Sequence, residues 1–347
     1  MSKVYLKSIK ADTPVQEIQA ITQELLKTLV EKENIQLRET VPLKVHFGEK
    51  GNVTYLKSDN FIGIIDYLKQ QNIDTRYMET TVMYGGQRYR KDLHLKTAAE
   101  HGFDQIPIHI ADGEQGELYD EITIHRKHFK TCKIGKDFSD FDQMIVLSHF
   151  KGHTLAGFGG AMKQLSMGCA SKGGKLEMHM GIKPKISNRK CKKCDLCLSR
   201  CNEDAITIGE KKSFIDHDKC VGCGACLSIC PHKAVSIMSL SGIYSMIFER
   251  SDFYEKLMEY AYAAQIGKSN IYINFAMNIT KGCDCEPRKM KPIMDDFGIL
   301  ISSDPLAIDK ACYDMVKERG KAFRGFKQFE YAESIGLGST NYEIVEI

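Results

Sequence analysis

Eight of the thirteen cysteines lie in one segment, in two groups with the same internal spacing. Both groups read C-x2-C-x2-C-x3-C, and they consist of Cys191, Cys194, Cys197 and Cys201, then Cys220, Cys223, Cys226 and Cys230. The second group starts 29 positions after the first, and Pro231 follows its last cysteine. The sequence after each group repeats as well, since DAITI at 204–208 corresponds to KAVSI at 233–237. This duplication predicts two structural halves related by a pseudo-twofold axis.

The spacing is typical of [4Fe–4S] ligation, and the segment resembles the two-cluster ferredoxins of bacteria. Three closely spaced cysteines bind three irons of one cluster, and the fourth ligand comes from the other group. We therefore predict two clusters, one held by Cys191, Cys194, Cys197 and Cys230, the other by Cys220, Cys223, Cys226 and Cys201. Gly222 and Gly224 leave room for backbone N–H groups to turn toward cluster sulfurs. A pair of zinc sites is the alternative, but zinc knuckles usually use two separated C-x2-C pairs.

A second set of chemically capable residues lies outside that segment. Its members are His149, Lys151, His153, Lys163, Cys283 and Cys285. Gly157, Gly159 and Gly160 would let backbone N–H groups approach an anion, and a C-x-C pair can chelate a metal or act as a redox couple. We predict a polar site here that holds an additional metal or small anion. The alternative is that the histidines are ordinary hydrogen-bonded residues, the glycines permit tight turns and the loop thiols have no task.

The elements that must position these residues alternate between strands and helices. Strands are predicted over 4–9, 41–47, 76–82, 106–111, 121–128, 144–150, 270–276 and 298–302, and helices from 13–16 onward and over 60–68, 96–101, 254–265 and 305–317. A glycine-rich stretch, 152–181, interrupts the pattern. The alternation predicts an α/β fold, a mostly parallel sheet with helices on both faces. Further polar groups follow predicted strands or precede Gly181, namely Lys44, His46, Glu49, Glu177 and His179.

The position of the cysteine segment predicts an insertion. The simplest organisation is a discontinuous α/β domain over 1–185 and 240–347, with a small ferredoxin-like 4Fe–4S module at 186–239. Exposed loops tolerate insertions when the ends of the insert lie close together.

Composition narrows the class of protein. Hydrophobic residues make up 43% and charged residues 27%, as in globular proteins. Neither a secretory signal nor a run of 18 apolar residues is visible, so we predict no membrane span and a cytoplasmic protein with reduced thiols. The net charge of +3 falls to roughly −1 once two clusters of about −2 each are added, so no nucleic-acid partner is predicted. A basic run beside the first cysteines is either a solvated face or a docking site for an acidic electron carrier such as a ferredoxin or flavodoxin; it contains Lys183, Lys185, Arg189, Lys190, Lys192 and Lys193.

Several motifs together resemble a known family. They are SHFKGH at 148–153, GFGGAMK at 157–163, CDC at 283–285 and GILISSDPLAID at 298–309. The family is domain of unknown function 362, whose members are often labelled iron–sulfur centre proteins and often carry an inserted ferredoxin module. The resemblance covers essentially the whole chain. It implies an α/β fold around a two-cluster module and leaves the reaction open.

Three functions compete at this point. The first is an oxidoreductase whose clusters pass electrons to or from a substrate in the α/β domain. The second is a non-catalytic electron-transfer protein or subunit. The third is a metal- or cluster-handling accessory protein in which Cys283 and Cys285 carry the cargo. No flavin, nicotinamide or molybdenum motif is visible, so the sequence names no substrate.

Overall fold

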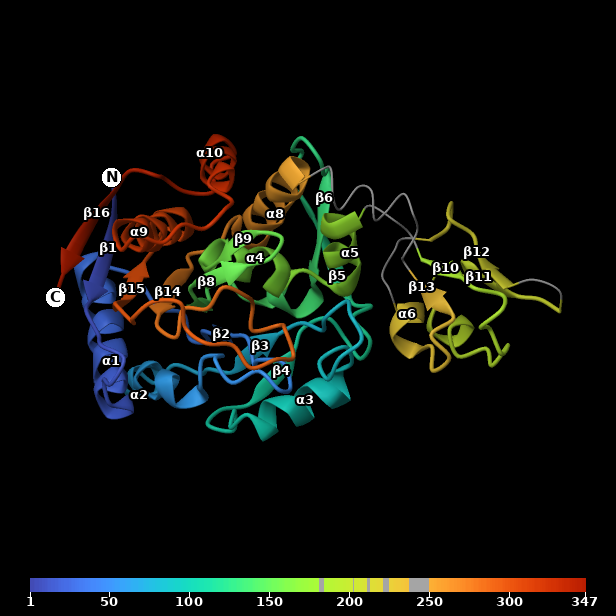
Figure 1. Cartoon of the computed structure of the whole chain (residues 1–347), viewed down its shortest axis with the longest axis horizontal. Helices are drawn as coiled ribbons and strands as arrows, with labels where there is room; N and C mark the ends of the chain where they lie inside the picture. The colour runs from blue at the N-terminus through green and yellow to red at the C-terminus, as the bar shows by residue number, and fades with distance from the viewer. Residues whose placement is uncertain (181–183, 202, 211–212, 221–224, 237–249) are drawn as a thin grey trace.

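The computed structural model describes residues 1–180, 184–201, 203–210, 213–220, 225–236 and 250–347. Its centre is an eight-stranded sheet in the order β16-β1-β15-β14-β7-β2-β3-β4 (Figure 1). The strands are β1 (Ser2–Lys7), β2 (Leu43–Lys44), β3 (Tyr77–Glu79), β4 (Ile108–Ile110), β7 (Ile145–His149), β14 (Ile271–Ala276), β15 (Gly298–Ser302) and β16 (Tyr342–Glu346). Only the two pairs made by β15 are antiparallel. The predicted mostly parallel α/β sheet is therefore confirmed.

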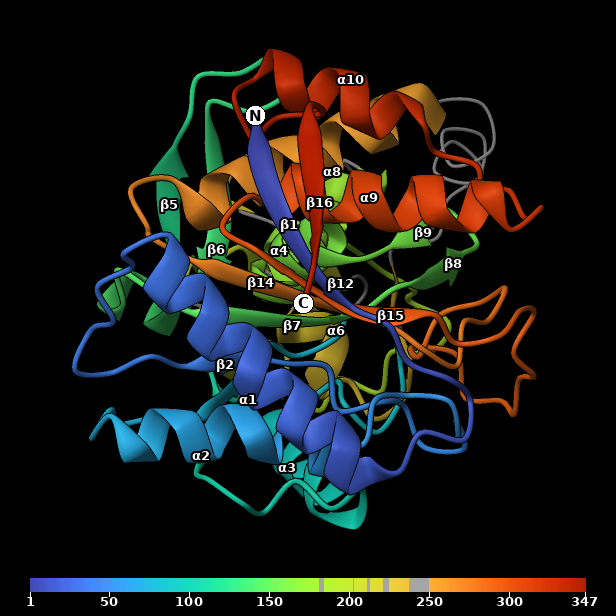
Figure 2. The same ribbon diagram turned by 90° about the vertical axis from the view of Figure 1, so that its left-hand side faces the viewer.

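Helices cover both faces of this sheet. On one face lie α1 (Val15–Lys32), α2 (Ile62–Gln70), α3 (Lys91–Glu100) and the short 3-10 helix η1 (Ser58–Phe61). The other face carries α4 (Ala161–Cys169), α8 (Arg250–Gln265), α9 (Pro305–Glu318) and α10 (Lys327–Ser334). Figure 2 shows α1 and α2 on one side of the strands and α8, α9 and α10 on the other.

The strand sequences explain why both faces are covered. In β7, Ile145 and Leu147 join the hydrophobic cluster under α1 and α2, while Val146 joins the cluster under α4 and α8. Side chains alternate between the faces of a strand, so a continuous apolar run needs a cover on each side. In α1, the buried residues recur every three or four positions, which gives the helix a single apolar face.

The helices α9 and α1 begin in different ways. Asp304 caps α9, because its Oδ1 accepts hydrogen bonds from the N–H groups of Leu306 and Ala307, with Pro305 at the first helical position. Thr13 does not cap α1, where Pro14 takes the cap position. The Thr13 hydroxyl instead accepts a hydrogen bond from the N–H of Lys10, so it stabilises the preceding turn.

The sequence reading was wrong for two stretches. Residues 151–180 hold a hairpin and two helices: β8 (Lys151–His153), β9 (Gly157–Gly159), α4 and α5 (Lys172–Met180). The predicted strand at 121–128 belongs to a separate hairpin of β5 (Tyr119–Thr123) with β6 (Thr131–Gly135), followed by the 3-10 helix η2 (Lys136–Asp140). The helices α4 and α5 were missed because glycine disfavours a helix by about 1 kcal/mol per residue. They form because the packing of an apolar face outweighs this cost.

Between α5 and α8 the chain forms small elements of its own. They are β10 (Lys185–Ile186), η3 (Leu198–Arg200), β11 (Ile206–Ile208), β12 (Ser213–Ile215), α6 (Ala225–Ile229) and β13 (Val235–Ser236). They make two two-stranded sheets around a separate small cluster of buried side chains, and Figure 1 shows them at one end of the molecule. Within the described part of the chain, no helix is long and apolar enough to cross a membrane.

Candidate functional site

The carboxyl ends of the parallel strands β2, β3, β4, β7 and β14 lie along one edge of the sheet. His46 and Glu49 follow β2, His149 ends β7, and the loop after β14 carries Cys283 and Cys285. Open α/β sheets bind ligands at this edge, since the loops that diverge there leave a crevice. The topology thus gathers polar groups that are far apart in sequence.

A cavity of about 490 Å³ lies at this edge, which is within the range of small-molecule sites. One part of its wall is apolar and consists of Val82, Met83, Leu155, Met167 and Phe253. Of the residues predicted from sequence, His153, Lys163, Cys283 and Cys285 line it.

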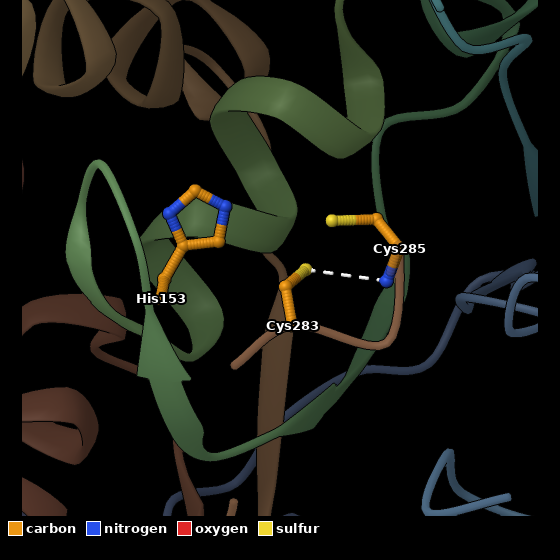
Figure 3. Close-up of side chains that lie close together, drawn as sticks. All are labelled: His153, Cys283 and Cys285. Atoms are coloured by element: carbon orange, nitrogen blue, oxygen red, sulfur yellow. Dashed lines mark hydrogen bonds between the residues drawn. The ribbon is translucent and has the colours of Figure 1, made fainter. Parts of the chain in front are cut away.

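His153, Cys283 and Cys285 converge on one point of the cavity wall. One ligand atom from each lies within 4.8 Å of the other two, and Figure 3 shows both sulfur atoms beside each other and facing the imidazole. Cys283 Sγ accepts hydrogen bonds from the N–H of Cys285 at 3.4 Å and from Lys163 Nζ at 3.8 Å. The N–H of Ala156 donates to His153 Nδ1 at 2.9 Å, so a neutral ring carries its proton on Nε2.

These contacts separate the properties of the two thiols. Hydrogen bonding from Cys285, the charge of Lys163 and the His153 imidazole outweigh burial and hold the pKa of Cys283 well below its usual value. The same contact with Cys283, together with burial, raises the pKa of Cys285. Burial acts to lower the pKa of Lys163, but Cys283, Cys285 and Asp284 together more than offset it, so the pKa of this amine is raised. The cavity wall therefore places the more acidic of the two thiols, Cys283, beside the Lys163 ammonium.

His149 and Lys151 lie behind the cavity and not on its wall. Asp284 Oδ2 accepts from His149 Nδ1 at 2.9 Å and from Lys151 Nζ at 2.8 Å, and His149 Nε2 lies 2.8 Å from the carbonyl of Met277. Burial alone would raise the pKa of the Asp284 carboxyl, but His149 and Lys151 lower it. This buried network fixes the residue between the two thiols, so His149 and Lys151 position the loop.

A second buried network lies on the loops after β2 and β3, where the Tyr84 hydroxyl donates to the carbonyl of Cys285 at 3.2 Å. Sequence reasoning missed most of this network. Lys44 Nζ contacts Glu79 Oε1 at 2.8 Å, and the Arg88 side chain contacts Glu49 at 3.2 Å and Glu79 at 3.7 Å. Arg88 also donates to the Tyr84 hydroxyl at 2.6 Å. Glu79 ends β3 as observed, but the predicted strand continued to residue 82, so the rule that sites follow strand ends did not indicate it. Arg88 follows a glycine pair and carries no such signal.

Lys175 is a further missed residue of the cavity. Its Nζ donates to Thr80 Oγ1 at 2.5 Å, to the carbonyl of Thr81 at 2.6 Å and to that of Ala170 at 2.9 Å. Burial lowers the pKa of this amine to about 8. The pKa values of these two lysines of one cavity therefore change in opposite directions. Lys163 has the acidic thiol of Cys283 beside it, whereas Lys175 donates hydrogen bonds to neutral oxygens.

The glycine loop expected to bind an anion has a partner inside the protein. The first N–H groups of α4, those of Ala161 and Met162, donate to the Asp309 carboxylate at 2.7 and 3.0 Å. A Cβ on Gly160 would stand 2.2 Å from Asp309 Oδ1, and one on Gly157, where φ is +85°, would stand 1.9 Å from the carbonyl of Arg324. These two glycines allow close packing, and the Asp309 carboxylate occupies the N-terminus of α4 where an anion was expected. Burial raises the pKa of Asp309 to about 6.

The chain leaves and re-enters the α/β part beside the cavity. His179, near the end of α5, and Phe253, near the start of α8, both line the cavity, and their rings lie 5.0 Å apart. Burial lowers the pKa of His179 to about 3. Glu177, the other polar residue noted before Gly181, forms an ion pair with Lys133 and accepts from the Tyr260 hydroxyl at 2.6 Å. The end of α5 and the start of α8 thus both lie at the candidate site.

The cysteine-rich segment between α5 and α8 shows the duplication read from the sequence. Ile186 pairs with Val235, and Ile215 pairs with Ile206. A shift of 29 residues converts the first pair into the second. Each half therefore gives its first strand to the last strand of the other half.

Hydrogen bonds repeat in the two halves in the same way. The N–H of Ala205 donates to Cys201 Sγ at 3.4 Å, and the N–H of Ala234 donates to Cys230 Sγ at 3.3 Å. Cysteine sulfurs that bind a metal typically also accept hydrogen bonds from nearby N–H groups.

The structure brings one predicted cysteine set together. Cys191, Cys194, Cys197 and Cys230 all line one small hollow, with Ile186 and Val235 behind them. In the other set, Cys201, Cys220 and Cys226 pack in the small buried cluster of the segment. Cys223, Gly222, Gly224 and Lys183 lie outside the described residues. Of the basic run, Lys185, Arg189, Lys190, Lys192 and Lys193 are exposed.

The fold and site define an α/β protein with a polar cavity at the carboxyl edge of its sheet and a cysteine-rich segment attached beside it. The sequence pattern described as Domain of unknown function (DUF362) matches residues 41–314, well over half of the chain. The chain therefore belongs to the DUF362 family, as its motifs indicated.

Among solved structures, a crystal structure of a protein from Thermotoga maritima is similar. The identity is 11%, the match covers 94% of this chain and 60% of that one, and the TM-score is 0.42. The chain thus spans less than two thirds of that protein's length. No match was found among curated proteins.

Proposed function

We propose that this protein is an iron–sulfur redox protein that carries two [4Fe–4S] clusters and exchanges electrons with the cavity of its α/β domain. The observation that carries the proposal is the set of cysteines around one hollow. Cys191, Cys194 and Cys197 come from the first group, and Cys230 comes from the second. This is the crossed set expected when two clusters share two duplicated motifs.

The chemistry of these donors fits the proposed group. Four thiols around one hollow suit a thiophilic iron cluster, and the bonds from Ala205 and Ala234 supply N–H donors to sulfur in both halves. When bound, [4Fe–4S] clusters accept and release single electrons. We assign the clusters to a ferredoxin-like module at 186–239, inserted in an α/β domain of residues 1–185 and 240–347.

Two features of the α/β domain support an oxidoreductase over a simple electron carrier. A carrier needs no cavity, whereas here about 490 Å³ is lined by two thiols of unequal acidity and by the side chains of Arg88, Lys163 and Lys175. The junction residues His179 and Phe253 lie on the same wall. This arrangement favours electron exchange between the module and a small molecule in the cavity.

The exposed basic run beside the first cysteines is the proposed docking site for the external electron carrier. Its lysines and arginines suit an acidic partner such as a ferredoxin or flavodoxin. The oxygen sensitivity and reduced thiols of such a protein fit the cytoplasm.

Metal analysis tests the proposal. Protein purified without oxygen should contain about 8 Fe and about 8 sulfide per chain and should show a visible absorbance that bleaches on reduction. Stoichiometric zinc without sulfide would contradict it. Cluster loss to an acceptor protein, with no electron transfer to any small molecule, would favour the accessory function instead.

A further inference from the structure

We propose that Cys283 and Cys285 form a redox-active dithiol that reduces a small disulfide bound in the cavity and is itself converted to an intramolecular disulfide. The two sulfurs lie within 4.8 Å of each other on the cavity wall. The inference rests on the proposed iron–sulfur function only for the step that restores the thiols.

The pair has the asymmetry that thiol–disulfide exchange requires. Cys283 lies beside the Lys163 ammonium and the imidazole of His153, which stabilise a thiolate. The charges of Lys163 and Arg88 act to lower the pKa of Cys285, but the contact with Cys283 and burial outweigh them, so Cys285 is the less acidic thiol and can act second. An attacking thiolate next to a resolving thiol is the minimal equipment for reducing a disulfide.

The loop is built to bring the two sulfurs together. The N–H of Cys285 already donates to Cys283 Sγ, and the N–H of Glu286 donates to the carbonyl of Cys283 at 2.9 Å, which closes a tight turn. Asp284, between the thiols, is fixed by His149 and Lys151. Its carbonyl also accepts from the N–H of Glu49 at 2.9 Å, which ties the turn to the loop after β2.

A metal ion held by His153, Cys283 and Cys285 is the competing interpretation, and the hydrogen bonds disfavour it. A metal-binding histidine normally donates its second N–H to an oxygen acceptor. Here His153 Nδ1 accepts from the N–H of Ala156, so Nε2 carries the proton and has no lone pair for a metal. Lys163 also places a positive charge 3.8 Å from Cys283 Sγ, where a cation would bind.

The proposed step balances as follows. The Cys283 thiolate attacks one sulfur of the substrate, the substrate S–S bond breaks, and Cys285 then displaces the second half as the Cys283–Cys285 bond forms. The substrate gains two electrons and two protons, one from Cys285 and one from solvent, and leaves as two thiols. Two one-electron transfers from an iron–sulfur donor, with one proton, restore the thiolate and the thiol.

Proteolysis gives a direct readout, because trypsin releases residues 282–288 (GCDCEPR) as a peptide whose only cysteines are Cys283 and Cys285. Reduced full-length protein is treated without oxygen with one equivalent of 2-hydroxyethyl disulfide, then denatured, alkylated with iodoacetamide and digested. We expect the doubly alkylated peptide to be replaced by a form that carries no alkyl group and is two hydrogen masses lighter than the unmodified reduced peptide. Free mercaptoethanol should reach about two equivalents per chain.

Variants and internal controls make the result decisive. Cys285→Ser should stop at a mixed disulfide of Cys283 with mercaptoethanol. Cys132, Cys169 and Cys312 are fully buried and their pKa values are raised by burial, so their peptides should stay unmodified in the folded protein. A peptide that keeps both alkyl groups after treatment, or a thiophilic metal that is stoichiometric and lost in Cys283→Ser, overturns the inference.

Iron measured on the same sample separates the two proposals. A protein with full iron and an inert peptide overturns the dithiol alone. A protein without iron whose peptide cycles overturns the proposed clusters and leaves the dithiol with another electron donor.

Discussion

The chain holds sulfur in two regions whose electrostatic surroundings are opposite. In the inserted segment, burial and the nearby Cys230 and Cys191 raise the pKa of Cys197. In the loop after β14, a neighbouring thiol and Lys163 lower the pKa of Cys283. Neighbouring thiolates repel one another, so they need a bound metal cation to neutralise their charge. The negative charge of Cys283 is neutralised by Lys163 of the same chain. One region is therefore suited to hold a metal cluster, and the other to keep a reactive thiolate.

The largest expected effect concerns the crossed ligands of the inserted segment. Cys194→Ser, Cys201→Ser and Cys230→Ser should each lower the iron content from about 8 to about 4 per chain, since each removes a ligand of one cluster. The double variant Cys194→Ser/Cys230→Ser should lose no more iron than either single variant, because both serve the same cluster. Cys194→Ser/Cys201→Ser should lose nearly all of it. The reverse pattern for the two double variants would show that each motif binds its own cluster.

The buried carboxylate of Asp284 fixes the loop after β14, so removing its charge should lower the stability of the folded protein. Asp284→Asn leaves Lys151 and His149 without a counter-charge, and we expect the free energy of unfolding at pH 7 to fall by about 3 kcal/mol. The folded pKa of Asp284 is lowered, so its contribution is present above the unfolded pKa of about 4 and is lost as the pH falls below it. The variant should therefore show a weaker pH dependence below pH 4.

Denaturant unfolding without oxygen at pH 7 and pH 3 measures this difference. Asp295→Asn is the matched control, because Asp295 is exposed in the same connection between β14 and β15. Equal losses of stability in the two variants would remove the argument that the network fixes the loop.

Lys163 should control how reactive Cys283 is. Without the ammonium the pKa of Cys283 rises, so the thiolate fraction at pH 7 falls, and we expect alkylation of Cys283 to slow roughly tenfold in Lys163→Met. The rate should recover as the pH is raised. Mass spectrometry of peptide 282–288 after timed iodoacetamide treatment measures it, with Lys289→Met, at an exposed site nearby, as the control. An unchanged rate in Lys163→Met would mean that the thiolate is stabilised by other groups.

The smallest expected effect is a shift in a labelling curve. Burial lowers the pKa of Lys175 to about 8, so its neutral amine should appear as the pH rises through that value. Amine labelling followed by peptide mass spectrometry should give a midpoint near pH 8 for Lys175. Lys163 supplies the contrast in the same cavity, since its pKa is raised and its labelling should require a higher pH. Identical midpoints would mean that the thiolate does not distinguish the two amines.

Local sequence rules located much of the fold and part of the site. Strand and helix alternation predicted the parallel sheet, and the rule that ligands bind past strand ends placed His153 and Cys283 near one another. The duplicated spacing at 191–230 predicted two halves related by a pseudo-twofold axis, because that pattern is repeated within the segment itself.

Other features depend on contacts between distant parts of the chain, which no local pattern records. Asp309 occupies the start of α4 although 148 positions separate it from Ala161. Arg88 and Lys175 reach the cavity because of the directions of their side chains. The tautomer of His153 follows from a turn that places the N–H of Ala156 against its ring.

The position of β1 has a consequence for synthesis on the ribosome. This first strand lies between β15 and β16, which are made last, so its backbone N–H and C=O groups cannot find their partners until nearly the whole chain has emerged. Residues 184–236 are complete well before that moment. We therefore expect the inserted segment to become structured on nascent chains while the large sheet is still open. Ribosome-bound chains that end near residue 290 should protect 184–236 from protease and leave β1 exposed, whereas a simultaneous onset of protection would contradict this order.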